Sequence, residues 1–264
     1  MCKVIAIANQ KGGVGKTTTT CNLGIGLARI GSRVLLIDLD SQGSLTSCLG
    51  IREPDELEIS LANVLESLIN DEEINVRDGL IHHEEGVDLI PGNIELSGLE
   101  VTLVNTMNRE RVLQQYINVV KNQYDYILID CTPSLGMLTI KALAGADSVL
   151  IPVQAEYLPT KGLQQLLRTI SKVKRQINPK LQIEGIVFTM VDERTNLAKD
   201  LMYVLNRAYQ DSIKFFVTHI PRSVRGAETP AKGISIFKYD QNGKIAAAYS
   251  ALTLEVYQNG ESGK

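Results

Sequence analysis

The chain has 264 residues, of which 44% are hydrophobic and 22% are charged, and its formal net charge is −3. This length and composition can bury a large core and fit one α/β domain, residues 1–264. No apolar stretch is long enough to span a bilayer, and the N-terminus starts with a strand pattern rather than a signal peptide. Four scattered cysteines without a C-x-x-C pair argue against a disulfide framework. We therefore expect a cytosolic protein.

The charge is unevenly distributed along the chain. Residues 1–160 contain 11 Lys and Arg against 21 Asp and Glu, whereas residues 161–264 contain 16 against 9. Such an asymmetry suggests that the C-terminal part has a face for a polyanion. An ordinary solvated surface would have the same composition, so charge alone leaves both interpretations open.

The first predicted element is a buried strand at Val4–Ala8. The segment NQKGGVGKTT follows at residues 9–18, and then a helix with Leu23, Leu27 and Ile30 at helical spacing. Strand, glycine loop and helix is the order of a P-loop, whose glycines let backbone N–H groups surround phosphate oxygens. The expected nucleotide-binding residues of this loop are Lys11, Gly12, Gly13, Val14, Gly15, Lys16, Thr17 and Thr18.

The residue types of the loop predict a nucleoside triphosphate with Mg²⁺ as the ligand. Lys16 would contact the β and γ phosphates, Thr17 would offer its hydroxyl to Mg²⁺, and the helix N-terminus would add partial positive charge. The alternative is a dinucleotide fold with Gly13-x-Gly15 as its glycines and Asp38 as the ribose acid. Lys-Thr after the last glycine favours a phosphate and a metal over that alternative.

A second parallel strand is predicted at Val34–Ile37, and it ends in DLDSQG. Carboxylates at the end of a strand beside the P-loop face the nucleotide crevice. Asp40 would hold or activate the attacking water, Gln42 would orient it, and Asp38 would reach the metal through a water. The structural alternative is that Asp40 or Ser41 caps the next helix.

A later apolar strand, Tyr126–Asp130, ends in one carboxylate, which is the Walker B arrangement. Asp130 is expected to hold the water shell of Mg²⁺. The following CTPSLG segment, with Gly136, would sense the γ-phosphate as a switch loop does.

The remaining pattern alternates apolar strands with amphipathic helices. Further strands are predicted at Val87–Pro91, Ser148–Val153, Ile183–Met190 and Phe215–Ile220, and helices at Ser60–Ile69, Ser97–Lys121, Lys161–Gln176, Asn196–Tyr209 and Gly243–Tyr257. This order predicts an α/β fold with a mainly parallel, doubly wound sheet and helices on both faces.

Several motifs resemble, in the same order, those of the ParA/Soj family of chromosome and plasmid partition ATPases, in the deviant Walker A class of P-loop proteins. KGGVGKTT is similar to the deviant Walker A motif, with Lys11 as its early lysine. DLDSQG is similar to the D-x-D-P-Q-G switch, with Ser41 in place of the proline, and YDYILIDCTPSLG resembles the Walker B region. IPVQAEYLPTKGLQQL, TMVDERTNL and IPRSVRGAETPAKG extend the resemblance over nearly the entire chain.

The resemblance implies a DNA-partitioning ATPase. ATP would drive a sandwich homodimer in which Lys11 reaches the partner's nucleotide, and the dimer would bind double-stranded DNA of the nucleoid without sequence preference. A ParB-type centromere-binding protein would stimulate slow hydrolysis and release. The implied catalytic residues are Lys11, Lys16, Asp40 and Gln42, the metal site is Thr17, Asp38 and Asp130, and the adenine contacts include Met190 and Pro221.

By the same resemblance, the residues that contact DNA would be Arg194, Arg222 and Arg225, with Lys172, Lys174, Arg175 and Arg207 as neighbours. Phosphate contacts give affinity without base readout, and dimerisation would double them. Taken singly, each of these side chains could instead be solvated or salt-bridged.

Three other functions share some of these features. A MinD-like ATPase would act on a membrane or a protein cargo, but EVYQNGESGK at the chain end has no apolar face to enter a bilayer. An iron–sulfur reductase or carrier would need a second cysteine at suitable spacing from Cys131. A regulatory protein would bind a protein partner and never DNA. Before Met1 there is no extension for a helix-turn-helix, so operator binding is not expected.

Overall fold

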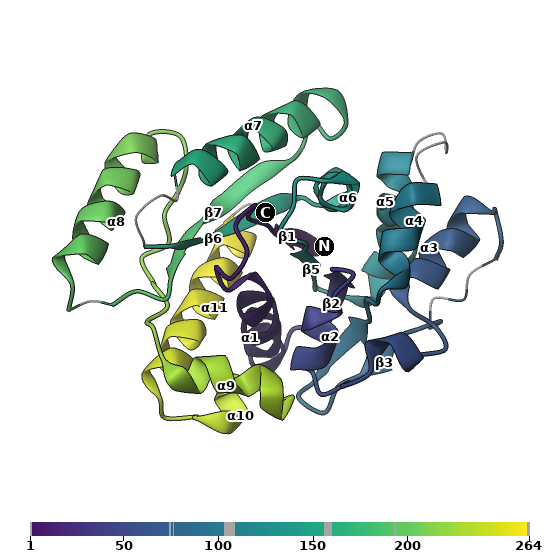
Figure 1. Cartoon of the computed structure of the whole chain (residues 1–264), viewed down its shortest axis with the longest axis horizontal. Helices are drawn as coiled ribbons and strands as arrows, with labels where there is room; N and C mark the ends of the chain where they lie inside the picture. The colour runs from purple at the N-terminus through teal and green to yellow at the C-terminus, as the bar shows by residue number, and fades with distance from the viewer. Residues whose placement is uncertain are drawn as a thin grey trace.

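The computed structural model describes residues 2–73, 75, 77–102, 109–155, 160–192 and 194–262. Within these residues seven strands form one sheet in the order β3-β4-β2-β5-β1-β6-β7, and every neighbouring pair is parallel except β3 and β4 (Figure 1). The strands are β1 (Lys3–Ile7), β2 (Val34–Leu39), β3 (Ile81–His82), β4 (Val87–Ile90), β5 (Tyr126–Cys131), β6 (Ser148–Gln154) and β7 (Gln182–Thr189).

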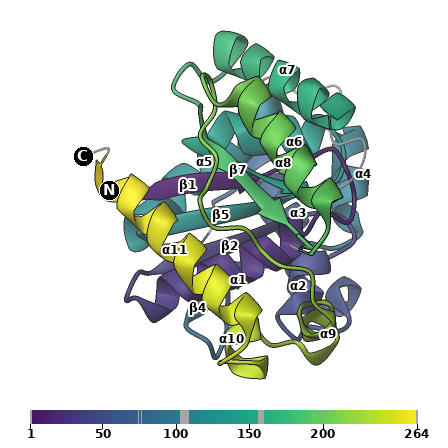
Figure 2. The same cartoon turned by 90° about the vertical axis from the view of Figure 1, so that its left-hand side faces the viewer.

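Helices cover both faces of the sheet (Figures 1 and 2). One face packs against α1, α2, α10 and α11, and the other against α3 to α8. The helices are α1 (Lys16–Arg29), α2 (Ser44–Cys48), α3 (Leu61–Ile69), α4 (Glu95–Thr102), α5 (Val112–Val120), α6 (Met137–Gly145), α7 (Thr160–Gln176), α8 (Asn196–Tyr209), α9 (Val224–Lys232), α10 (Ile236–Tyr239) and α11 (Lys244–Ser262). Among them, none is both long enough and apolar enough to cross a membrane.

Strand β1, which lies between β5 and β6, shows why helices cover both faces of the sheet. Val4, Ala6 and Ala8 belong to one core, whereas Ile5 and Ile7 belong to the other. Side chains of a strand alternate between faces, so a strand that is apolar at every position must be buried on both. The predicted fold class, a mainly parallel sheet wound with helices on both faces, is confirmed.

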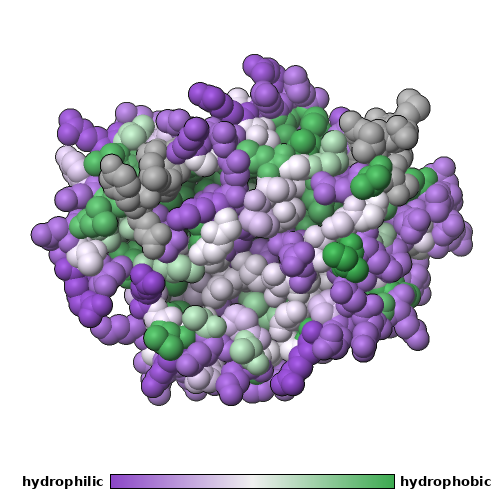
Figure 3. Space-filling view, viewed as in Figure 1, coloured by the Kyte–Doolittle hydropathy of each residue, from purple (hydrophilic) through white to green (hydrophobic). Residues whose placement is uncertain are grey.

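The carboxyl ends of the parallel strands define one edge of the molecule. In Figure 2, β1 runs toward this edge and the loop that follows it crosses to α1. Figure 3 is drawn in the direction of Figure 1, and it shows residues of intermediate hydropathy in the middle of that face with hydrophilic side chains around them. The loop after β1, the carboxyl ends of β2 and β5 and the connection after β2 carry the residues predicted for the phosphates, the metal and the attacking water.

Two predicted elements are wrong. The single helix expected at Ser97–Lys121 is divided, because α4 ends at Thr102 and α5 starts at Val112. Residues 103–108, which the prediction placed within this helix, lie outside the described residues. Residues 109–111 form a 3₁₀ turn directly before α5 and are all charged, so the apolar spacing that supports a helix does not continue through this turn.

The strand expected at Phe215–Ile220 is instead an extended segment with isolated bridges to β7 at Phe215 and beyond it at Pro221. Between these bridges the N–H groups of Val217 and Thr218 donate to the carboxylate of Glu255 on α11, at 2.9 and 2.8 Å. Phe216 and Ile220 still donate to the carbonyls of Ile186 and Phe188 on β7, so the carboxylate of Glu255 interrupts the ladder only at Val217 and Thr218.

Candidate nucleotide site and basic surface

Three neighbouring strands bring the predicted nucleotide site together. The register of β2 and β5 places Asp38 opposite Asp130, and the register of β1 and β5 places Ile7 opposite Asp130. Both carboxylates therefore lie at the level where β1 passes into the glycine loop. Parallel strands present their carboxyl ends at one edge, which is where open α/β sheets bind ligands.

Hydrogen bonds from two other strands hold the loop in place. The Asn9 amide donates to the carbonyl of Pro152 on β6 at 2.6 Å, and Asn9 Oδ1 accepts from the N–H of Lys11 at 2.9 Å. On the far side of the loop, the Thr189 hydroxyl at the end of β7 donates to the Val14 carbonyl at 2.7 Å. The loop is thus anchored at its entry and near its end by buried polar groups.

The backbone of the loop turns as a phosphate cradle requires. Gly13 and Gly15 have φ values of +69° and +83°, a region that L-residues with a Cβ rarely adopt. Gly15 is the N-cap of α1, and it has no side chain that could accept a hydrogen bond from the first N–H groups of the helix. These N–H groups and the helix dipole suit an anion at this position.

The hydroxyl of Thr17 donates to Asp130 Oδ2 at 2.7 Å. Thr20, one turn later, donates to Asp130 Oδ1 at 3.1 Å and to the Lys16 carbonyl at 3.0 Å. Asp130 is 1% exposed. Burial and the nearby Asp38 carboxylate raise the pKa of Asp130 to about 8, and the hydroxyl bonds partly offset this rise. The site thus gathers a hydroxyl and a carboxylate, which are hard oxygen ligands that suit Mg²⁺.

Lys16 lies inside the loop and is 6% exposed. Its ammonium donates to the Lys11 carbonyl at 3.2 Å. Burial lowers its pKa, while the charge of Asp130 acts in the opposite direction. A cation held in this way against a loop carbonyl is positioned to transfer to a phosphate oxygen, which pairs better with a charge than a carbonyl does.

Asp38 and Asp40 have different surroundings. Asp38 is fully buried, and Thr46 donates to its Oδ2 from both the backbone N–H and the hydroxyl, at 2.8 and 2.7 Å. Burial raises the pKa of Asp38 to about 6 despite these bonds. Asp40 accepts from the N–H of Gln42 at 3.1 Å. The side chain of Gln42 is exposed.

The alternative role of Asp40 as a helix cap is not what the structure shows. The N-cap of α2 is Gly43, with φ +58° and no side-chain cap hydrogen bond. A Cβ at Gly43 would lie 2.9 Å from the Gly92 carbonyl, so the end of β4 closes over this turn. The Asp40 carboxylate, 9% exposed, is held in the connection between β2 and α2.

A cavity of about 240 Å³ opens beside Gly15 and Thr18. Met190 and Pro221, the two predicted adenine contacts, both line it. Met190 has φ +51°, an uncommon conformation for a residue with a side chain, and such strain often marks a functional site. The cavity adjoins the start of α1, so a base in it would lie within reach of phosphates in the loop.

Lys11 is exposed at the surface of the loop, with its ammonium 3.5 Å from Gln154 Oε1 at the end of β6. Cys131, the cysteine nearest the loop, is 1% exposed, and burial raises the pKa of its thiol. A cluster ligand must be a thiolate, so this environment opposes the iron–sulfur interpretation.

Of the predicted DNA-contacting residues, the structure brings Arg194 and Arg222 together. Both line an open hollow of about 740 Å³ at the start of α11. Arg194 forms a salt bridge with Asp192 at 2.8 Å. Arg225 lies on α9 and pairs with Asp240 at 2.6 Å.

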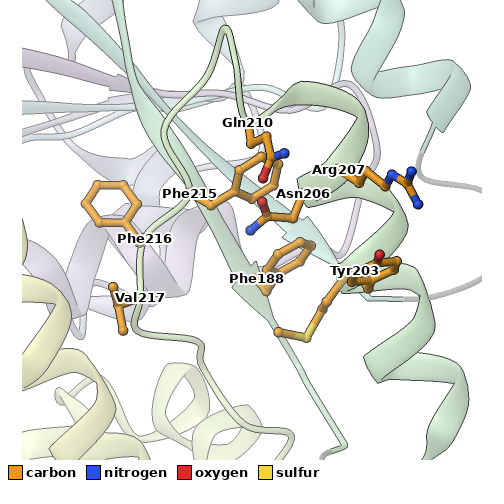
Figure 4. A pocket seen from close by; sticks show the side chains of 9 residues that line it. Phe188, Tyr203, Asn206, Arg207, Gln210, Phe215, Phe216 and Val217 are labelled. Atoms are coloured by element: carbon orange, nitrogen blue, oxygen red, sulfur yellow. The ribbon is translucent and has the colours of Figure 1, made fainter.

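The other basic residues lie elsewhere. Arg207 lines a groove of about 500 Å³ between α8 and the segment Phe215–Val217 (Figure 4). Phe188 and Phe215 stack in this groove, with 5.5 Å between their ring centroids. The exposed residues Lys172, Lys174 and Arg175 belong to α7. The predicted set therefore occupies several surfaces instead of one cluster.

Sequence reasoning missed the residues that hold the predicted ones in place, notably Asn9, Thr20 and Thr46. Each is a buried polar residue in a stretch whose sequence pattern indicates only a loop or a helix. A buried threonine needs a hydrogen-bond partner, and four threonines directly follow Lys16 in the KTTTT run, but which group is the partner depends on tertiary structure. Lys244 was also missed, and it lines the same hollow as Arg194 and Arg222.

Comparison with known proteins identifies the family. A model of the AAA domain family matches residues 2–183. The sporulation initiation inhibitor protein Soj of Bacillus subtilis is 46% identical over 262 residues, which are 98% of this chain and 100% of that protein. The chromosome partitioning protein ParA of Myxococcus xanthus is 43% identical over 256 residues, 96% of this chain and 87% of that protein.

A solved structure has the same fold as this chain. It is a Mycobacterium smegmatis protein described as cobyrinic acid a,c-diamide synthase, with bound ADP and magnesium. Its TM-score is 0.87 at 36% identity, and the match covers 100% of this chain and 97% of that one. With the loop, the two carboxylates and the strand order in place, these near full-length similarities show that the chain belongs to the ParA/Soj family of P-loop partition ATPases.

Proposed function

We propose that this chain is an ATP-dependent DNA-partitioning ATPase. In the proposed cycle, ATP and Mg²⁺ bind at the glycine loop and two copies then pair across their nucleotides. The dimer binds duplex DNA without sequence preference, and hydrolysis stimulated by a ParB-type protein releases it. The observation that carries the proposal is the juxtaposition of Lys16, Thr17 and Asp130 beneath an anchored glycine loop, 2.7 Å separating Thr17 Oγ1 from Asp130 Oδ2.

The residues of the loop fit ATP with Mg²⁺. The positive φ values of Gly13 and Gly15 allow the backbone N–H groups to surround phosphates, and the cavity beside Met190 and Pro221 has room for a base. Thr17 would ligate the metal, and Asp130 would hold its water shell. When bound, Mg²⁺ neutralises charge on the phosphate oxygens.

Side chains of the chain would bind the phosphates and position the attacking water. Lys16 would leave the Lys11 carbonyl and pair with the β and γ phosphates. Asp40 would hold the attacking water, with the exposed Gln42 orienting it. Asp38 would act through a water, because direct ligation by its Oδ2 would compete with the two hydrogen bonds from Thr46.

Pairing of two copies is supported by the position of Lys11. This side chain is exposed, so its ammonium can leave Gln154 for an anion on another molecule. Pairing would also present the basic residues twice, and affinity for DNA rises steeply with the number of phosphate contacts. ATP would then control DNA binding by controlling the dimer.

An electrophoretic shift assay on arbitrary duplex DNA tests the proposal. With ATP and Mg²⁺ the protein should retard the DNA, and the shift should weaken as salt is raised. ADP, or no nucleotide, should leave the DNA unshifted. Purified protein that stays monomeric and ignores DNA in saturating ATP, even with hydrolysis blocked, would contradict the proposal. Strong ATP-dependent sedimentation with liposomes would instead favour the MinD-like function.

A further inference from the structure

We propose that Glu100 on α4 is a positioning residue for ATP hydrolysis, because it holds the start of α6 and the loop before it, residues 132–136. The inference rests on the proposed function and on the expectation that this loop senses the γ-phosphate. Glu100 lies outside the motifs of the glycine loop, the two switches and the Walker B strand. Only the fold brings it to the loop, since α5 and β5 lie between α4 and α6 in the chain.

The contact is a hydrogen bond between two helices. The N–H of Leu138, in the first turn of α6, donates to Glu100 Oε1 at 3.2 Å. Gly136 is the N-cap of α6 and makes no side-chain cap hydrogen bond, and no acidic residue occurs in the first turn. The first N–H groups of a helix have no partner within it and carry partial positive charge, so a carboxylate suits this position. Glu100 therefore caps α6 from another helix.

Buried neighbours fix both ends of this contact. Leu99, which precedes Glu100 on α4, is 6% exposed, and Leu138 is 2% exposed. Both leucine side chains belong to the same core on one face of the sheet. The packing of α4 and α6 therefore holds the carboxylate and the N–H group close to each other, in addition to their own hydrogen bond.

The loop before α6 has hydrogen bonds of its own. Ser134 Oγ accepts from the N–H of Gly136 at 3.3 Å and from the hydroxyl of Thr132 at 3.2 Å. The carbonyl of Ser134 accepts from the hydroxyl of Thr139 on α6 at 2.6 Å. These bonds join the loop and α6 to each other, so they define the shape of the loop. The bond to Glu100 attaches this unit to α4 and so defines its place in the molecule.

The loop lies between α4 and the glycine loop. A Cβ at Gly12 would lie 3.8 Å from the Cβ of Pro133, which is an ordinary van der Waals contact. A Cβ at Gly136 would lie 3.2 Å from Glu100 Oε1. One end of the loop therefore adjoins the expected phosphate site, while the other adjoins Glu100. A displacement of about 1 Å at an active site can cost about 100-fold in rate, so a cap that holds this loop affects hydrolysis.

The steady-state kinetics of ATP hydrolysis by the full chain test the role of Glu100. In Glu100→Ala, kcat should fall by about tenfold or more, because the loop loses its attachment to α4. KM for ATP and the affinity for a fluorescent ATP analogue should stay near the wild-type values, since the glycine loop and the residues that line the base cavity belong to other segments.

The conservative variant is Glu100→Gln. Glutamine keeps an acceptor oxygen for the Leu138 N–H and lacks the charge, so its kcat should lie between the values of the wild type and of Glu100→Ala. A glutamine variant as slow as the alanine variant would overturn the capping role. A parallel loss of ATP affinity and kcat in Glu100→Ala would overturn it as well, because the defect would then include nucleotide binding.

The matched control is Glu66→Ala. Glu66 on α3 is exposed, and together with Gly98 and Leu99 of α4 it lines a hollow of about 290 Å³. This variant removes the same charge beside α4 and should hydrolyse ATP at the wild-type rate. Equal losses of kcat in the two alanine variants would count against Glu100, since they would show that only the charge near α4 matters.

Hydrogen exchange distinguishes a positioning role from a general loss of stability. In the ligand-free protein, the amides of residues 132–138 should exchange faster in Glu100→Ala than in the wild type, while the amides of the glycine loop should keep their wild-type rates. Unchanged exchange at residues 132–138 would exclude the attachment of the loop. A lower melting temperature with a wild-type kcat would show that the contact is only structural, and this result too would overturn the proposal.

Failure of this inference differs from failure of the proposed function. If the wild-type protein hydrolyses ATP and Glu100→Ala has the wild-type kcat, Glu100 does not position the loop and the proposed function stands. If the wild-type protein hydrolyses no ATP during long incubation with saturating ATP and Mg²⁺, the proposed function has failed and this inference with it.

Discussion

Thr46 donates both its backbone N–H and its hydroxyl to Oδ2 of Asp38, at 2.8 and 2.7 Å. The same hydroxyl accepts a hydrogen bond from the N–H of Gly92 at 3.1 Å. One side chain thus joins the first turn of α2, the carboxylate after β2 and the exit of β4. Thr46 and Asp38 are both fully buried, so these bonds have no water to replace them.

We expect Thr46→Val to lower both stability and activity. Valine keeps the shape but leaves Asp38 and the Gly92 N–H short of a partner, and an unsatisfied buried group costs about 1–3 kcal/mol. Chemical denaturation should show this loss of stability. ATP turnover should fall more than ATP affinity, because Asp38 lies opposite Asp130, beside the expected position of Mg²⁺. Thr46→Ser keeps the hydroxyl and should restore most of the turnover. Equal turnover in the valine and serine variants would contradict the role of the hydroxyl.

Lys16→Ala should abolish nucleotide binding. A hydrogen bond to a charged group contributes about 1.5–3 kcal/mol, so loss of an ammonium that contacts two phosphates should reduce affinity by about 100-fold or more. Because Lys16 is buried at a cost in desolvation, the ligand-free variant should melt no lower than the wild type. Titration with a fluorescent ATP analogue measures the first effect, and a thermal melt measures the second. A variant that binds ATP normally would remove Lys16 from the site.

Asp40→Ala should separate binding from hydrolysis. The Asp40 carboxylate accepts from the Gln42 N–H and lies in the connection after β2, so its loss should leave the loop and the base cavity intact. We expect normal ATP affinity, turnover reduced by about 100-fold or more as for loss of a general base, and DNA binding that persists after ATP is added once. Phosphate release measured beside the DNA shift assay tests this. Normal turnover would refute the role given to Asp40.

The parts of this structure that follow local sequence rules were predictable. The buried strands, the glycine loop and the carboxylates at strand ends depend on residue type and spacing. The fold class predicted from them is confirmed by the sheet order. The hydrogen bonds that join Asn9 to Pro152, Thr46 to Gly92 and Thr189 to Val14 connect segments far apart in the chain, and no local pattern indicates them. The same reason explains the wrong strand after Phe215, since Glu255 lies 38 residues after Val217 and accepts from the N–H groups of Val217 and Thr218 only in the folded chain.

The two buried carboxylates predict how stability depends on pH. The pKa values of Asp38 and Asp130 are raised to about 6 and about 8 in the folded protein, above the value of about 3.9 for an unfolded Asp. Their contribution to stability is therefore fully present below about pH 4 and is lost as pH rises through about 6 and then 8. Without Mg²⁺ and nucleotide, the melting temperature should fall across this window.

Asp130→Asn is the matched variant for this effect, because the amide cannot ionise. Its melting temperature should fall less between about pH 6 and 9 than that of the wild type. Adding Mg²⁺ and ATP near the upper pH should raise the wild-type melting temperature more than the variant's, since the ionised carboxylate then has a cation beside it. Identical pH profiles for the two proteins would show that Asp130 is not the titrating group.

Lys11→Ala should leave each monomer able to bind ATP and unable to pair. The Lys11 side chain is exposed and contacts Gln154. The N–H of Lys11 that donates to Asn9 Oδ1 and the Lys11 carbonyl that accepts from Lys16 are backbone groups, so the substitution keeps both. ATP affinity should therefore stay near the wild-type value, while light scattering with ATP and Mg²⁺ should find monomers only. Lys161→Ala is the control, because Lys161 on α7 lines, together with Lys11, an open hollow of about 400 Å³ beside the loop. Loss of pairing in both variants would assign the effect to the charge of this surface rather than to Lys11, and pairing retained in Lys11→Ala would exclude the cross-subunit contact.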